Sequence, residues 1–168
     1  MKGPAGFQRL TLFGMNLVLC FFISVIMLWV IQSQNPDAPI LTPAAVLLSF
    51  VTSFVVGYTW ADLVPAFNWG LKIAQATGLI KSKIATHIVL SITLGVVMGV
   101  GIAFLCSFIT NFGTQGWAGV MAFFTAMLPY ILGSAIILVV IFLIPIQAAA
   151  KAISGFDPAA AQSPQGPG

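Results

Sequence analysis

Ionisable side chains are scarce in this chain, and their scarcity excludes most kinds of chemistry. Its 168 residues include three aspartates, no glutamate, one histidine and six lysines or arginines. So few carboxylate and imidazole groups cannot build a metal cluster of the usual type. No glycine-rich loop follows a predicted strand, so a nucleotide-binding motif is also missing. The sequence therefore predicts a protein that is not an enzyme and that uses no cofactor and no metal.

Clustered positive charge is absent too. The net charge is +3, but the basic residues are scattered along the chain and lie at the ends of apolar runs. A nucleic-acid interface needs basic residues gathered on one face. We therefore expect no nucleic-acid partner.

Cysteine is rare as well, with only Cys20 and Cys106. Counted along their own apolar runs, the two sulfurs differ in depth by roughly 15 Å. A disulfide requires Cα atoms within about 7 Å of one another. Two free thiols that pack as small apolar side chains are therefore predicted.

What the chain has in abundance is apolar sequence: 60% of its residues are hydrophobic and 5% are charged. A run of about 20 apolar residues crosses the hydrocarbon core of a bilayer as a helix. The helix is required because lipid offers no partner for backbone hydrogen bonds. The sequence therefore predicts an all-α integral membrane protein with four transmembrane helices, at Leu10–Ile31, Ala44–Val64, Thr86–Ile109 and Ala118–Ile144.

The distribution of basic residues predicts the orientation. They precede the first run, lie between the second and third, or follow the fourth: Lys2, Arg9, Lys72, Lys81, Lys83 and Lys151. The two other connections contain no lysine or arginine. Because short cytoplasmic loops carry the excess of positive charge, both termini and the middle loop are predicted to face the cytoplasm. We expect a multi-pass protein of the cell membrane.

Five segments follow from this topology. The middle loop mixes apolar and basic residues, so it is predicted to lie along the membrane interface. The C-terminal tail is rich in Pro, Gly, Ala and Gln, which predicts disorder. The segments are a cytoplasmic N-terminus (1–9), a first transmembrane hairpin (10–65), an interfacial loop (66–85), a second hairpin (86–148) and a disordered cytoplasmic tail (149–168).

The two hairpins end alike, and this likeness indicates a duplication. "LVP" at Leu63–Pro65 recurs as "LIP" at Leu143–Pro145, and a lysine follows each. Such halves would be parallel repeats about an axis normal to the membrane. In "LVPAFNWGLK" and "FLIPIQAAAK" the chain resembles small bacterial membrane proteins made of a two-transmembrane-helix domain of unknown function, often in tandem. The resemblance implies a four-helix cell-membrane protein and no activity or ligand.

Small residues recur at every fourth position of the second and third apolar runs. A spacing of four keeps them on one helix face, where another backbone can approach closely. We expect these faces to make close helix–helix contacts, with each other or, as an alternative, in a homodimer. The residues concerned are Ser49, Ser53 and Gly57 in the second run and Ser91, Gly95, Gly99 and Ala103 in the third.

Two ionisable residues lie at the cytoplasmic ends of apolar runs, Asp62 and His87. Ionisable groups inside a membrane are costly, which makes them candidates for an ion or proton site. The simpler interpretation is interfacial, with Asp62 paired to Lys83 or Arg9 and His87 hydrated among the headgroups.

The leading functional hypothesis is a non-enzymatic accessory or self-associating subunit that acts by helix packing. Its partners would be the bilayer and either a second copy or another membrane protein. The alternative is a small transporter or channel component that uses Asp62 and His87.

Overall fold

Helices account for most of the part of the chain that the structure describes. The computed structural model describes residues 2–37 and 39–156, and within them it contains helices and no strand. The elements in chain order are α1 (Gly3–Gln34), α2 (Pro43–Leu63), α3 (Ala66–Ala76), a single 3-10 turn η1 (Leu79–Lys81) and α4 (Lys83–Ser154). Helices α1, α2 and α4 are long and apolar enough to cross a membrane. The predicted all-helical class is confirmed, and the long apolar helices indicate a membrane protein.

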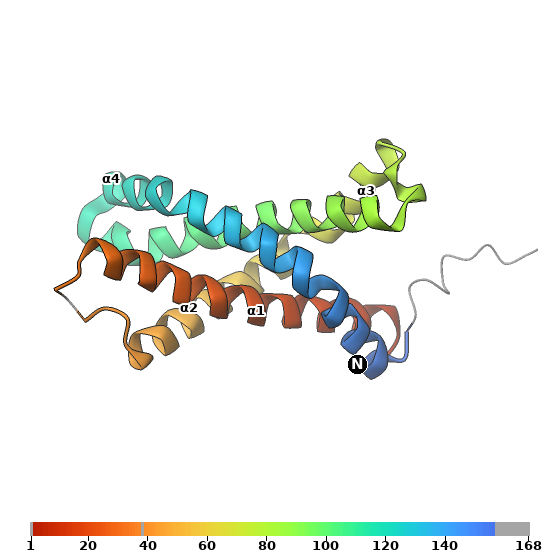
Figure 1. Ribbon diagram of the computed structural model, residues 1–168, viewed down its shortest axis with the longest axis horizontal. Helices are drawn as coiled ribbons and strands as arrows, with labels where there is room; N and C mark the ends of the chain where they lie inside the picture. Colours follow the sequence, from red (N-terminus) through yellow and green to blue (C-terminus); the bar gives the residue numbers. More distant parts are fainter. Residues whose placement is uncertain (1, 38, 157–168) are drawn as a thin grey trace, which may run out of the picture.

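Helix α4 consists of two arms that reverse at a single residue. Inside α4 only Gly116 has non-helical backbone angles, with φ 61° and ψ −158°. This region of φ and ψ is essentially restricted to glycine. Figure 1 shows the chain turning back there, so residues 83–115 form a first arm and residues 117–154 a second.

The segment Thr110–Trp117, which lies between the predicted third and fourth runs, was expected to be a non-helical connection. In the structure the first arm stays helical through residue 115, directly before Gly116. Its polar side chains bond to the preceding turn of the helix. The Thr110 hydroxyl donates to Cys106 O at 2.8 Å, and Asn111 Nδ2 donates to Ser107 O at 3.1 Å. These local bonds let polar residues extend the helix beyond its apolar part.

Other boundaries also differ from the expectation. Helix α1 begins at Gly3 rather than Leu10, and the second arm runs to Ser154, through part of the tail predicted to be disordered. The rest of that tail, residues 157–168, lies outside the described residues. Hydropathy marks only the lipid-immersed part of a helix, whereas backbone hydrogen bonds continue until a cap such as Gly155 (φ 67°) ends them.

Cys20 and Cys106 are both free. Because α1 begins earlier than predicted, their separation along the helix axes also differs from the expectation. A Cβ atom at Gly57 would lie 3.1 Å from Cys20 Sγ and 3.0 Å from Ile102 Cδ1. Cys20 is therefore level with Ile102, one helical turn before Cys106. The predicted difference in depth was too large, because it was counted from helix starts that the structure moves.

The elements run along the long axis of the molecule and gather their ends in two groups (Figure 1). One group contains the N-terminus, α3 and the C-terminal end of α4. The other contains the α1–α2 connection and the reversal at Gly116. We call the first group the basic end, because all six lysines and arginines lie at the N-cap or start of α1, in α3 and η1, or at the two ends of α4.

Contacts between the hairpins join α1 to the second arm of α4 and to Phe156 just beyond it. The rings of Phe7 and Phe156 are 5.9 Å apart between centroids, and those of Phe22 and Phe142 are 6.0 Å apart. Gly14 lies against Ile146, whose Cγ2 would be 2.9 Å from a Cβ at that position.

Helix α2 packs in turn on the first arm. Trp60 Nε1 donates a hydrogen bond to Val97 O at 3.0 Å, and the Trp60 ring covers Gly101. Each helix of the first hairpin therefore contacts one arm of the second.

Candidate functional site

The small-residue face of α2 packs against α1. Ser53 and Gly57 are buried, whereas Ser49 is half-buried. The Ser53 hydroxyl is 3.1 Å from Ser24 Oγ, and Ser53 O accepts a hydrogen bond from Cys20 Sγ at 3.2 Å. Gly57 lies directly against Asn16. The missing side chains thus make room for polar groups of the neighbouring helix.

The small-residue face of the first arm packs against the second arm. Its four members, Ser91, Gly95, Gly99 and Ala103, are all buried. A Cβ atom at Gly95 would lie 2.9 Å from Ile136 Cα, which shows how closely the backbones approach. The two small-residue faces therefore pack on different partners, within a single chain.

Sequence reasoning missed the polar side chains of α1 that meet the α2 face. Asn16, Cys20 and Ser24 are each at most 1% exposed, and Asn16 Nδ2 donates to Phe54 O at 2.9 Å. Their spacing of four residues was the available signal. It resembles the spacing on α2, but the polar residues lie within a run that was interpreted as apolar.

The structure places Asp62 and His87 in different surroundings. Asp62 is exposed and lines a small cleft with Arg9 and Tyr58. His87 lines a large cavity, and its Nε2 is 3.1 Å from Val140 O. Within the described residues, Asp62 forms no ion pair with Arg9 or with His87. The two groups do not constitute one site.

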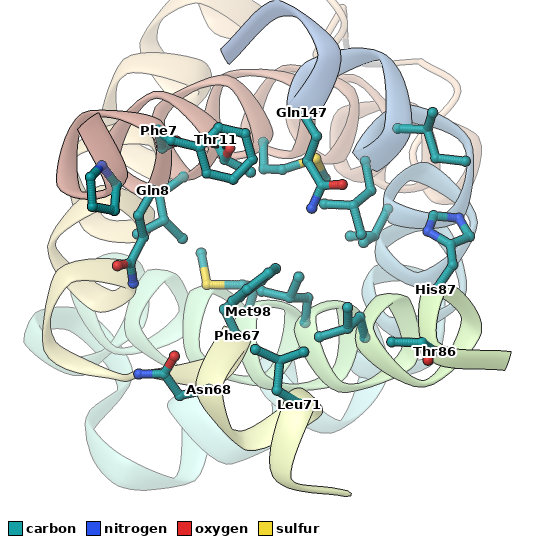
Figure 2. Close-up of a pocket in the computed structure, with 18 of the residues that line it drawn as sticks. Phe7, Gln8, Thr11, Phe67, Asn68, Leu71, Thr86, His87, Met98 and Gln147 are labelled. Carbon is teal, nitrogen blue, oxygen red and sulfur yellow. Dashed lines mark hydrogen bonds between the residues drawn. The ribbon is translucent and has the colours of Figure 1, made fainter. Parts of the chain in front are cut away.

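That large cavity lies at the basic end, enclosed by the start of α1, by α3 and by both arms of α4 (Figure 2). Its volume is about 590 Å³. Sites for small ligands measure about 300–1,000 Å³. The cavity is thus large enough for a small molecule, and it is the candidate functional site.

Polar side chains form the mouth of the cavity, which we define by six residues from four segments: Gln8, Asn68, Lys83, Thr86, His87 and Gln147. Figure 2 shows the Gln147 amide directed into the opening. The amides of Gln8, Asn68 and Gln147 and the ammonium of Lys83 form no hydrogen bond or ion pair with other described residues. The mouth therefore presents free donors and acceptors.

Apolar side chains form the floor, which we define by six residues: Met15, Leu19, Leu90, Leu94, Met98 and Leu143. Each is buried, with at most 7% of its surface exposed. Each Å² of apolar surface that is removed from water contributes about 25 cal/mol to binding. A ligand that places hydrocarbon in this space is therefore favoured. The cavity is thus amphipathic, with a polar entrance and a hydrocarbon interior.

Little in the sequence indicates this cavity. It forms because α3 and the start of α1 diverge at the basic end (Figure 1), leaving a space that the two arms line from the other sides. The available signal was that isolated amides, Gln8, Asn68 and Gln147, each follow or precede an apolar run by a few residues. Nothing in that pattern shows that they converge.

Comparison of the chain with protein families, with curated proteins and with solved structures finds no match. The resemblance in layout to tandem two-helix membrane proteins therefore stays a prediction.

Proposed function

We propose that this chain is a non-enzymatic, multi-pass protein of the cell membrane that holds an amphiphilic ligand in the cavity at its basic end. The observation that carries the proposal is the cavity itself: about 590 Å³, with an apolar floor and a polar mouth. The alternative of an ion path through Asp62 and His87 is not favoured, because these residues line separate spaces.

The proposal includes four membrane crossings with both termini in the cytoplasm. It is supported by the grouping of the start of α1 and the end of α4 with α3, and of all six basic residues with them. Positive residues anchor the cytoplasmic side of short loops. A reporter that is active only after export, fused behind Gly168, should be silent, whereas one inserted after Gly113, beside the reversal, should be active. The opposite pattern would reject this orientation.

The proposal also includes two hairpins related as parallel repeats. The pairing of α1 with the second arm and of α2 with the first arm supports it, because a two-fold axis between the hairpins would exchange these two contacts.

Ligand retention is the test of the cavity. Protein purified in mild detergent should carry a small amphiphile that native mass spectrometry detects. Met98→Trp fills the floor and should remove it, whereas Val100→Trp, a substitution on the outward side of the same arm, should not. Leu90→Trp gives a second filling variant nearer the mouth. Equal retention in all variants would reject the proposal.

A second candidate function is that of an accessory subunit associating with a second copy or another membrane protein. The observation in its favour is a row of exposed small residues on the second arm: Ala118, Ala122, Ala126 and Gly133. A Cβ at Gly133 would meet no atom within 4 Å. Helices in lipid associate through such faces. Gly133→Leu should therefore lower the oligomer fraction in mild detergent, and a monomeric wild type would reject this candidate.

A further inference from the structure

The mouth and the floor of the cavity differ in charge and polarity, and this difference restricts the ligand. We infer that the occupant is a single-tailed anionic amphiphile, with an oxyanion headgroup at the mouth and its hydrocarbon tail along the floor. The inference rests on the proposed function and adds to it the charge of the headgroup and the number of tails.

The charge follows from the residues of the mouth. Lys83 and His87 are the ionisable residues among those that line the cavity in the described chain, and none of the lining residues is acidic. Lys83 is exposed and has no ion-pair partner among the described residues. The free amides of Gln8, Asn68 and Gln147 add N–H donors around it. Charge-assisted bonds from such donors favour carboxylate or phosphate oxygens.

The single tail follows from the dimensions of the floor. From Lys83 at the mouth to Met98 at the deep end, the first arm rises by about 22 Å. One leaflet with its headgroups is about half of a 40–45 Å bilayer, so the cavity spans the depth of one leaflet. Its volume of about 590 Å³ lies in the range of sites that hold one small molecule. That space suits one chain rather than a bilayer lipid with two.

Photo-crosslinking tests the inference on the full-length protein in nanodiscs of phosphatidylcholine. The probes are a fatty acid with a diazirine near the end of its tail, used where its carboxylate is ionised, and the alcohol of the same length. The acid should label floor residues such as Met15 and Met98. The alcohol should label them about fivefold less. This factor is the affinity that one partly exposed ion pair supplies at the upper end of its usual range.

A matched pair of variants isolates the charge at the mouth. Lys83→Gln should bring labelling by the acid down to that by the alcohol. Lys72→Gln removes the same charge from α3, does not touch the cavity, and should leave labelling unchanged. Added salt should weaken the preference for the acid, because screening acts on partly exposed charges.

Competitors distinguish the sources of the headgroup. A single-tailed phosphate monoester that displaces the acid supports the shared oxyanion chemistry, whereas inorganic phosphate should not displace it. Equal competition by two-tailed phosphatidylglycerol would overturn the single tail. Equal labelling by acid and alcohol, unaffected by Lys83→Gln, would overturn the anionic headgroup while the proposed cavity function stands. If no probe labels the floor, the proposed function itself fails.

Discussion

The close backbone approach between the arms of α4 can be tested at Gly95. In Gly95→Ala, the new Cβ would lie 2.9 Å from Ile136 Cα and 3.0 Å from Ile136 N. Ordinary carbon contacts are about 3.5–4.0 Å. Because the opposing atoms belong to the backbone, no side-chain rotation relieves the contact. The arms must separate locally by about half an ångström or more.

The expected cost follows from two opposed effects. Overpacking a tight contact costs about 1–3 kcal/mol. Alanine is preferred over glycine in a helix by about 0.5–1 kcal/mol. Gly95→Ala should therefore lower the free energy of unfolding by about 1–2 kcal/mol.

Gly133→Ala is the matched control, because a Cβ there meets no atom within 4 Å. It gains the same helix preference without the contact, so the two variants should differ by the overpacking cost of about 1–3 kcal/mol. The assay is reversible unfolding in mixed micelles titrated with SDS, followed by circular dichroism. If Gly95→Ala is as stable as Gly133→Ala, the close approach of the arms is not what the structure describes.

Three further outcomes are expected. Asn16→Leu removes the hydrogen bond to Phe54 O and should lower stability by about 1–2 kcal/mol in the same unfolding assay; an unchanged midpoint would mean that the bond contributes nothing. Gly116→Ala forces a side chain into a backbone region that only glycine adopts freely, so it should lower the free energy of unfolding by about 1–3 kcal/mol. Gly113→Ala, whose new Cβ would meet no neighbour, should not lower it. Equal stability of the two variants would refute the tight reversal. Asp62→Asn should leave the unfolding midpoint nearly unchanged, because an exposed charge near Arg9 contributes at most about 1 kcal/mol to stability. A larger loss of stability would show that the Asp62 carboxylate interacts with its neighbours more strongly than its exposed cleft indicates.

The helices could be predicted from the sequence because length and hydropathy alone identify a segment that is able to cross a bilayer as a helix. Boundaries were harder. Gly3 starts a helix that hydropathy places at Leu10, and residues 110–115 stay helical although they are polar. In both places local backbone hydrogen bonds, which leave little trace in hydropathy, set the boundary.

The small-residue spacing drew attention to Gly57 and Gly95, which both lie at close contacts. It did not identify which helix each face meets. The α2 face packs on a polar row of α1, and recognising that pair requires matching Asn16 with Gly57 across two runs. The cavity could not be predicted for a related reason. It depends on how far α3 diverges from α1, and that divergence is set by tertiary packing rather than by the composition of either segment.

The contact between α1 and the second arm has a consequence for biogenesis. Phe7 meets Phe156, and Gly14 meets Ile146, so α1 finds its partner only in a stretch of chain that is made long after it. During synthesis α1 and α2 can pair early through Asn16 and Ser53, but one side of α1 stays without its partner until the second arm of α4 has been made. Contacts of such long sequence separation form slowly. A chain truncated near Gly116 therefore keeps its first hairpin and presents an uncovered helix face to membrane quality control.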